Sequence, residues 1–324
     1  MNPWLLASLI FTALALAGQT NTSTPRLTAD GQPDLQGTWQ DNSATPLERP
    51  KELEGRQFLT DKEVAELKQR ADRLFKNGYS DFAGGDTFFL AALRDVGKYK
   101  NPNTTSSSDE MVAREFDNRT SLVIDPPDGR IPPFTPDGKR RQAAAIASIS
   151  FQRPPSGPQD LSSAMRCITP GVPRIGGRFG AGNDGYYQIM QSRGYVIFFM
   201  EAFHDARIIP LDGRPHLPPE IRTWNGDSRG RWEGKTLVVD TTNFSPKSSF
   251  MGAAENLHLV ERFTRVAADV LNYEVTIDDA TTWTKPWTVL VRLKQTKDKL
   301  YEFACHEGNL PMMGTLAGAR AQDK

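Results

Sequence analysis

All four histidines of this 324-residue chain lie within one stretch, between residues 186 and 307. Imidazole titrates near neutral pH, so a histidine beside a carboxylate can accept and return a proton during a reaction. The same stretch supplies two carboxylates that could orient an imidazole and an arginine that could stabilise an oxyanion. The candidate catalytic residues are therefore His204, Asp205, Arg207, His258, Glu261 and His306. The remaining histidine, His216, lies in a proline-rich loop and is the least suited of the four.

Local spacing does not support a metal site at these residues. Glu201 with His204, or His258 with Glu261, would share a face at i and i+3 only on a helix, and strands are expected here. No cofactor is predicted. A divalent metal stays open, and the sequence leaves the metal content unknown.

Two short segments match the sequence patterns of enzyme motifs, but neither has the secondary structure around it that its motif requires. Residues 180–185 fit G-x-G-x-x-G, but a dinucleotide site needs a helix after the motif, and the following residues predict a strand. Residues 226–230 fit G-x-S-x-G, and Asp240 with His258 or His306 supplies the chain order of an α/β-hydrolase triad. That motif belongs on a strand-to-helix turn, whereas this segment enters a hairpin, so serine hydrolysis is a minor hypothesis.

The elements that must position the candidate residues read as a run of short strands. Alternating apolar and polar residues joined by tight turns predict about eight antiparallel strands, as at Leu271, Tyr273, Val275 and Ile277, which would form one apolar face. The expected strands lie near 187–191, 195–203, 204–211, 229–232, 236–244, 257–266, 271–278, 288–296 and 300–306. Closure into a barrel removes exposed edges, and an eight-stranded barrel can hold one small ligand. The expected fold is mainly β, an antiparallel meander closing into a barrel with a smaller helical N-terminal part.

Two helices are predicted outside this meander. Thr60 and Glu63 form a capping box before apolar residues at helical spacing, and Gly78 would end that helix. Thr135 and Pro136 open a second helix that continues to about residue 148. A polar run at 101–109 marks a boundary. The predicted organisation is thus a segment 18–110, with a first strand and one amphipathic helix, and a barrel domain 111–324 with one inserted helix.

The first 17 residues resemble a signal peptide. Trp4 to Ala17 is apolar or small throughout, and Ala15-Leu16-Ala17 has the form of a cleavage site, although the preceding residues lack Lys and Arg. The run is shorter than the roughly 20 residues that span a membrane. We therefore expect cleavage after residue 17, a periplasmic or secreted location, and no stable membrane anchor afterwards.

The two cysteines, Cys167 and Cys305, allow two interpretations. In an oxidising compartment they could form a disulfide around a long loop, or they could be separate buried thiols, because pairing cannot be read from sequence. A nucleophilic Cys305 activated by His306 is disfavoured because neighbours on a strand point to opposite faces.

Overall composition excludes one class of partner. The chain has 39 Lys plus Arg and 39 Asp plus Glu, so no net field would attract nucleic acid. Its 38% hydrophobic content is enough for a proper core. The expected partner is a small-molecule ligand or substrate, and the oligomeric state stays open.

Several short runs carry resemblances. Gly37-Thr38-Trp39 before a meander resembles the opening of lipocalin-like (calycin) barrels. The chain is also similar, over most of its mature length, to a family of exported bacterial proteins of unknown function. The runs that carry this similarity are Asp125-Pro-Pro-Asp-Gly-Arg-Ile-Pro-Pro133, Ile208-Ile-Pro-Leu-Asp-Gly-Arg-Pro-His216, Gly226-Asp-Ser-Arg-Gly-Arg-Trp-Glu-Gly234 and Cys305-His-Glu-Gly-Asn309. The resemblance implies export and a shared fold, and it implies no activity.

Two functions remain compatible with the sequence. One is an exported barrel enzyme that uses a His/carboxylate/Arg site for proton-transfer chemistry, as a lyase, isomerase or hydrolase, on a small organic molecule. The other is a non-catalytic periplasmic binding protein for a small apolar or aromatic ligand, in which aromatic residues such as Trp224 and Trp232 would line a pocket rather than only form core. Convergence of His204, His258 and His306 in one cavity would favour the enzyme.

Overall fold

The computed structural model describes residues 26–74, 79–80, 85–97, 112–149, 154–175, 185–307 and 309–322. The expected signal peptide at 1–17, the helix end at Gly78, the boundary at 101–109 and residues 180–184 of the glycine-rich motif lie outside them. Among the described residues, no helix is long and apolar enough to cross a membrane.

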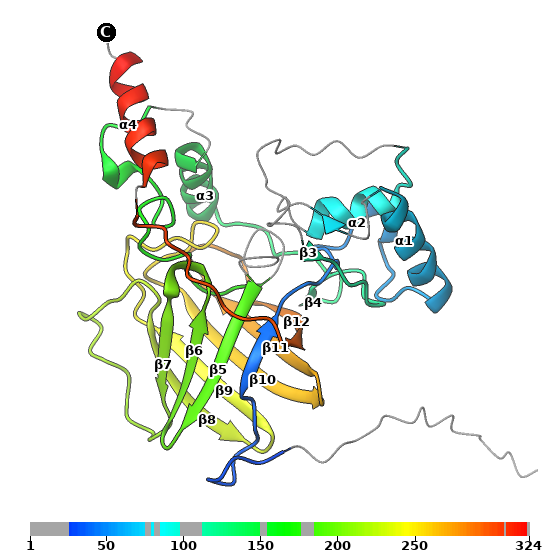
Figure 1. The fold of residues 1–324 in the computed structure, drawn as a ribbon. Coiled ribbons are helices and arrows are strands. Elements are labelled where there is room, and N and C mark those ends of the chain that lie inside the picture. Colours follow the sequence, from blue (N-terminus) through cyan, green and yellow to red (C-terminus); the bar gives the residue numbers. More distant parts are fainter. Residues whose placement is uncertain are drawn as a thin grey trace, which may run out of the picture.

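The molecule is mainly β, as expected, with four α-helices beside one large sheet (Figure 1). The α-helices are α1 (Asp61–Leu74), α2 (Gly85–Leu93), α3 (Pro136–Ile149) and α4 (Leu310–Gln322), and the 3-10 turns are η1 (Lys51–Leu53), η4 (Pro158–Asp160) and η6 (Ala202–His204). The strands are β1 (Gly37–Gln40), β2 (Tyr79–Ser80), β3 (Val112–Ala113), β4 (Val123–Asp125), β5 (Tyr186–Ser192), β6 (Tyr195–Met200), β7 (Ala206–Pro210), β8 (Asp227–Glu233), β9 (Thr236–Thr242), β10 (His258–Ala267), β11 (Val270–Asp278) and β12 (Trp287–Thr296).

The large sheet has ten strands, and its main path runs β7-β6-β5-β1-β12-β11-β10-β9-β8 with antiparallel neighbours throughout. Strand β4 pairs with β12 beside this path. Strand β1 comes from the N-terminal segment, yet it lies in the middle of the sheet between β5 and β12. The first strand of the chain therefore joins the two meanders, β5 to β7 and β8 to β12.

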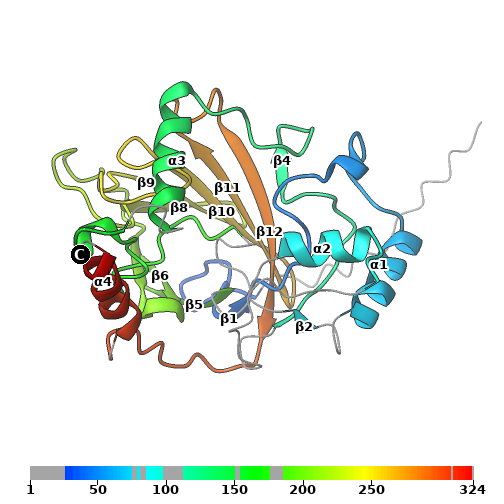
Figure 2. The same cartoon turned by 90° about the horizontal axis from the view of Figure 1, so that it is seen from above.

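The sheet curls strongly but is not closed into a barrel, so barrel closure is not confirmed (Figure 2). Strands β7 and β8 are its two edges, and because eight antiparallel steps separate them, they run in the same direction. They approach through side chains: a Cβ added at Gly230 would lie 2.6 Å from Leu211 Cδ2 and 2.9 Å from Ile209 Cγ2. Pro210 also removes one backbone donor from the β7 edge. Side chains therefore join the two edges, which are not paired as neighbouring strands of the sheet.

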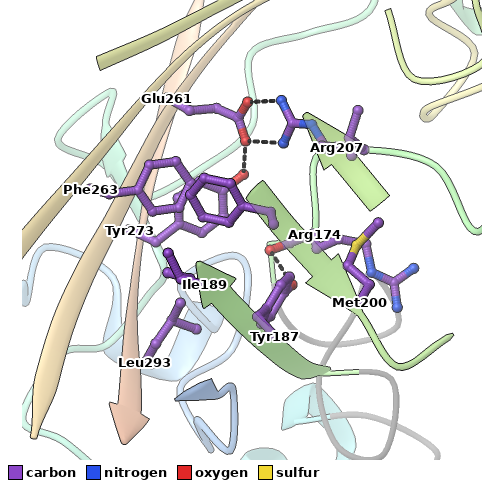
Figure 3. A pocket seen from close by; sticks show the side chains of 11 residues that line it. Arg174, Tyr187, Ile189, Met200, Arg207, Glu261, Phe263, Tyr273 and Leu293 are labelled. Carbon is purple, nitrogen blue, oxygen red and sulfur yellow. Dashed lines mark hydrogen bonds and ion pairs between the residues drawn. The ribbon is translucent and has the colours of Figure 1, made fainter. Parts of the chain in front are cut away.

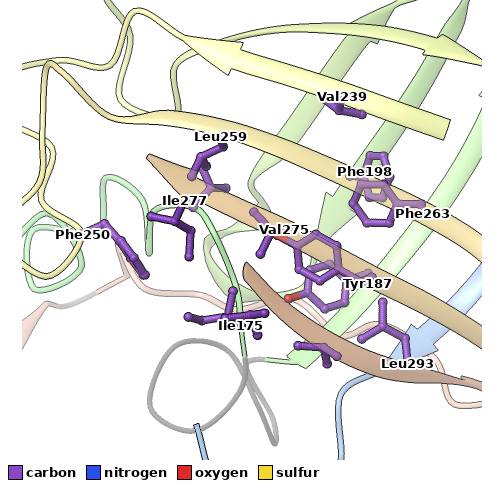
Figure 4. Close-up of a cluster of buried hydrophobic side chains, with 14 of the residues drawn as sticks. Ile175, Tyr187, Phe198, Val239, Phe250, Leu259, Phe263, Val275, Ile277 and Leu293 are labelled. Atoms are coloured by element: carbon purple, nitrogen blue, oxygen red, sulfur yellow. The ribbon is translucent and has the colours of Figure 1, made fainter. Parts of the chain in front are cut away.

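The concave face of the sheet holds the main core (Figure 4). Strand β11 alternates as predicted, since Leu271, Tyr273, Val275 and Ile277 are at most 4% exposed and the residues between them face outward. At 0% exposure Trp39 belongs to the same core, and its indole Nε1 donates to the Leu35 carbonyl at 2.9 Å. The core thus fills the space that the curled sheet surrounds.

Both predicted helices are present with their predicted N-terminal caps. Before α1, the Thr60 amide donates to Glu63 Oε2 at 2.8 Å, and the Glu63 amide donates to Thr60 Oγ1 at 3.3 Å. Before α3, Thr135 Oγ1 accepts from the Gly138 amide at 3.0 Å. Helices α1 and α2 share a second, smaller core beside the sheet.

Two local predictions are wrong. Residues 300–306 form no strand; the segment lies along η6, where the Phe303 amide donates to His204 Nε2 at 2.9 Å and the Tyr301 amide donates to Glu201 at 3.1 Å. His204 itself ends η6 with φ +50° instead of lying on a strand. The alternation at 300–306 had suggested a strand, but no strand edge is paired with it.

The cysteines form a disulfide between Cys167 and Cys305. This bond joins the connection before β5 to the segment that follows β12, across 138 positions of sequence. It settles the choice that the sequence had left open.

Candidate functional site

A buried polar network lies inside the sheet, against the apolar core (Figure 3). Arg207 on β7 reaches across the seam and donates from Nη1 and Nη2 to the two carboxylate oxygens of Glu261 on β10, at 3.0 and 2.5 Å. The Tyr273 hydroxyl donates to Glu261 Oε1 at 2.9 Å. Arg207 Nη2 also donates to the hydroxyls of Ser228 and Thr241, at 3.1 and 3.2 Å. Two predicted site residues, Arg207 and Glu261, are therefore direct partners.

Burial determines the electrostatics of this network. The side chains of Arg207 and Glu261 are 8% and 1% exposed. Burial opposes the charge on Arg207, but the ion pair and hydrogen bonds with Glu261 outweigh it and raise the pKa of the guanidinium. Burial, and next the charge of Glu261, raise the pKa of Tyr273 well above its usual range, so the phenol keeps its proton.

The cavity beside this network is small. Its volume is about 20 Å³, with Phe198, Met200 and Phe263 among its apolar walls. A space of this size holds about one water molecule. The network inside the sheet is therefore packed by side chains and has no room for a ligand of several atoms in this conformation.

A second polar network lies on the outer face of the same strands. Asp240 on β9 bridges two imidazoles, with Oδ1 2.9 Å from His216 Nε2 and Oδ2 2.9 Å from His258 Nε2. His216 Nδ1 lies 2.9 Å from Asp227 Oδ2, and Asp227 Oδ1 accepts from Arg229 at 2.6 Å. The outer cluster, defined as His216, Asp227, Arg229, Asp240 and His258, is thus one continuous chain of alternating charges.

Strand alternation explains why the two networks lie on opposite faces. On β8, β9 and β10, successive side chains point inward and outward in turn. Ser228 and Thr241 point inward to Arg207, whereas their neighbours Asp227 and Asp240 point outward. The strand register places Asp240 opposite Arg229 on β8 and opposite Val260 on β10. Val260 is two residues after His258, so both point to the outer face.

The two ring nitrogens of His216 both face acceptors, so the number of N–H donors on this ring matters. A neutral imidazole has one N–H donor, but both nitrogens of His216 face carboxylate oxygens. Two donors are available only in the imidazolium form. A hydrogen bond to Asp240 raises the pKa of His258, and the reciprocal bond from His258 lowers the pKa of Asp240.

These shifts predict a pH window for the stabilising effect of Asp240. The His258 contribution is present below the ordinary histidine pKa of 6.5 and is lost as the pH rises through the raised value. The Asp240 contribution is present above its ordinary 3.8 and is lost as the pH falls through the lowered value. We expect Asp240→Asn to destabilise most between about pH 4 and 6.5, by up to about 1 kcal/mol because the pair is partly exposed. Urea unfolding of both proteins from pH 3 to 9 checks this, and a difference that grows steadily above pH 8 would contradict it.

The three histidines expected to meet in one cavity do not converge. His258 lies in the outer cluster, His204 accepts a backbone hydrogen bond from the C-terminal segment, and His306 is exposed after Cys305. The Asp205 carboxylate accepts hydrogen bonds from the Thr169 hydroxyl and from Asn225 Nδ2, the latter at 2.6 Å. Among the described residues it forms no hydrogen bond with a histidine side chain. The reason is that the residue pattern placed all three on strands of one barrel wall, whereas η6 and the segment 300–306 are irregular.

The G-x-S-x-G motif also takes a different role. Ser228 lies within β8, and its hydroxyl contacts Arg207 and Thr241 on the inner face. Asp240 and His258 are on the outer face, so the strand separates the serine from them. The motif is part of a hairpin strand, as its sequence context indicated.

Sequence reasoning missed several members of the outer cluster. His216 was ranked last because of its proline-rich loop, yet that loop folds back onto β8 and β9, where the Leu217 amide also donates to Asp227 at 2.9 Å. Asp227 and Arg229 alternate with the inward-facing Ser228, which is a signal that polar side chains line the outer face. No feature of the sequence indicated that the loop containing His216 folds back onto β8 and β9.

Comparisons with known proteins give no relative. No known family model matches the chain, and no curated protein or solved structure is significantly similar to it. Among the residues that the structure describes, no group of three or more His, Cys, Asp or Glu side chains could hold a metal ion. The function must therefore be argued from the residues themselves.

Proposed function

We propose that this protein is an exported enzyme that carries out proton transfer on a small organic molecule, as a lyase, isomerase or hydrolase, at the outer cluster. The observation that carries the proposal is the Asp240 carboxylate, which binds the imidazoles of both His216 and His258 at 2.9 Å. Coupled imidazoles and carboxylates are the groups that enzymes use to move protons near neutral pH.

In this proposal His258 is the general acid and base. Its side chain is 40% exposed, and Nδ1 makes no hydrogen bond with any described residue, so that nitrogen is accessible to a substrate. Asp240 orients the ring through Nε2, which determines the nitrogen that exchanges a proton with the substrate. Arg229 supplies positive charge beside Asp227, and His216 lies within 2.9 Å of both Asp227 and Asp240.

The scaffold that we propose is a lipocalin-like barrel in a periplasmic or secreted protein. Side-chain contacts across the β7–β8 seam, from Arg207 to Ser228 and from Ile209 and Leu211 to Gly230, support an arrangement in which the curled sheet behaves as a closed unit. The apolar N-terminal run supports export.

A second candidate function is binding of a small apolar or aromatic ligand without catalysis. A groove of about 330 Å³ lies at the seam between β7 and β8, and Ile208 and Trp224 are among its lining residues. Its volume is at the lower end of the range for small-molecule sites. This groove, rather than the filled interior, favours the alternative.

Replacing His258 tests the enzyme directly. We expect His258→Gln to reduce turnover by about 100-fold or more, because positioned acid–base groups contribute at least that much. The measurement is a mass-spectrometric screen of the mature protein against pooled esters, glycosides, epoxides and enolisable ketones, followed by kinetics on any compound that is converted. Asp240→Asn should shift the pH–rate profile of the same reaction, because His258 loses the hydrogen bond that raises its pKa.

The matched control is His306→Gln, which removes an exposed histidine outside both polar networks. It should retain full turnover. Turnover that survives in His258→Gln at the level of the control, or a wild-type protein that converts no compound while binding one in the seam groove, would favour the binding function instead.

A further inference from the structure

A groove of about 520 Å³ lies away from both polar networks, between residues 46–52, helix α2 and the turn that follows β4. None of its lining residues belongs to the outer cluster or to the Arg207 network. Its volume is within the range of small-molecule sites. Its walls carry charged side chains from three separate segments of the chain.

One wall is a turn within the proline-rich run 125–133, held rigidly by Arg49. The Arg49 amide donates to the Gly129 carbonyl at 2.8 Å, and Arg49 Nη1 donates to the Pro127 carbonyl at 3.0 Å. Gly129 has φ +70°, and a Cβ there would lie 2.9 Å from Arg49 Cζ, so the turn packs directly on the guanidinium and requires glycine. The run therefore forms a fixed platform beside the groove.

The residue that this platform presents is Arg130. The Arg130 amide donates to Asp128 at 3.0 Å, and the next amide, that of Ile131, donates to Glu48 at 2.9 Å. These bonds fix the backbone on both sides of the Arg130 side chain, which is exposed and lines the groove.

The carboxylates of the groove are already engaged. Glu48 accepts from Ile131, Asp86 accepts from the Leu47 amide at 2.8 Å, and Glu52 pairs with Arg94 at 2.8 Å. In contrast, the side chains of Lys51 and Arg130 make no hydrogen bond or ion pair with any described residue. The lining therefore has one more cation than carboxylates, and Lys51 and Arg130 are two cations whose donors are not taken by a carboxylate.

Arg49 is a third, buried cation that lines the same groove. It is 5% exposed, and its Nε and Nη1 are bound to Thr120 and Pro127, while Nη2 makes no hydrogen bond with any residue that the structure describes. A buried guanidinium held on two sides, with one nitrogen left over, is pre-organised to donate to an oxygen atom of a ligand.

We propose that this groove binds a small organic dianion, a phosphate monoester or dicarboxylate, whose oxyanion accepts from Lys51, Arg130 and Arg49 Nη2. Both ligand types present several oxygen acceptors and a charge near −2, so one oxyanion can accept from Lys51 and Arg130 together. The remainder of the groove, which includes Pro46, Pro50 and Leu90, is less polar and accommodates the organic part.

Calorimetric titration at constant ionic strength tests the proposal, with inorganic phosphate and malonate as the two probes. Wild-type protein is expected to bind at least one of them saturably, with one site per chain, and the stronger probe identifies the oxyanion type. The double variant Lys51→Gln/Arg130→Gln should weaken that binding by about tenfold or more, because charged hydrogen bonds are lost.

The matched control is Arg193→Gln/Lys247→Gln, which removes two exposed cations that are outside this groove. It should bind the probe as the wild type does, and thermal unfolding should show that both variants stay folded. Absence of saturable binding of both probes to the wild type would overturn the proposal. So would equal binding by Lys51→Gln/Arg130→Gln and the wild type, or equal weakening in the two double variants.

Discussion

Replacing Glu261 with glutamine is expected to lower the free energy of unfolding by about 3–5 kcal/mol, because it leaves the Arg207 charge buried without its counterion. Glutamine keeps the size of the side chain, so the loss reports the ion pair rather than a cavity. Both partners are at most 9% exposed, and the nearest remaining acceptors are the hydroxyls of Ser228 and Thr241. Urea unfolding of the purified variants at neutral pH measures this loss.

A double-mutant cycle measures the interaction free energy between Arg207 and Glu261 separately from the contribution of each side chain. Arg207→Met combined with Glu261→Gln removes both charges, so the double variant should be more stable than Glu261→Gln alone. Glu233→Gln is the exposed control; it breaks bonds to Arg231 and Arg262 at the surface and should cost far less stability than Glu261→Gln. Losses that simply add in the double variant would show that the two side chains do not act as a buried pair.

Reducing the disulfide is expected to have an effect of similar size. The bond between Cys167 and Cys305 closes a loop with a sequence separation of 138, for which chain entropy in the unfolded state predicts about 5 kcal/mol. We expect the Cys167→Ser/Cys305→Ser variant to be less stable than the oxidised protein by about 2–5 kcal/mol. Denaturant unfolding of the variant and of the oxidised wild type gives the difference.

The matched control for the disulfide is the same pair of proteins under reducing conditions. There the wild type should lose stability and approach the serine variant, while the variant should not change. The hydrogen bonds of Glu201 and His204 to Tyr301 and Phe303 keep the C-terminal segment close, so the variant should still fold. Equal stability of oxidised wild type and variant would show that these bonds alone anchor the segment.

Local patterns predicted two of the four α-helices, α1 and α3, and did not predict α2 or α4. The capping box at Thr60 and the proline after Thr135 specified where two helices begin, because those signals act within a few residues of the helix end. Alternation on β11 specified its buried face for the same reason. The segment 300–306 has a similar alternation and forms no strand, since a strand also needs an unpaired edge to bind.

The candidate sites depend on contacts between residues far apart in the chain, which local sequence patterns do not specify. Arg207 and Glu261 were both named from their chemistry, but their pairing requires β7 and β10 to face each other across the interior, 54 positions apart in sequence. His216 was ranked last because its loop has no periodicity, yet both of its nitrogens contact carboxylates on β8 and β9.

By itself, the sequence determined the mainly β class, the two capped helices, and which residues of each strand share a face, because these follow from interactions between near neighbours. Only the tertiary structure decided that the curled sheet has two packed edges instead of a closed wall, that its centre is filled, and that the polar residues form separate inner and outer networks. Those outcomes depend on the register of distant strands and on the path of irregular loops, where the free-energy differences arise from long-range packing and leave no periodic trace in the chain.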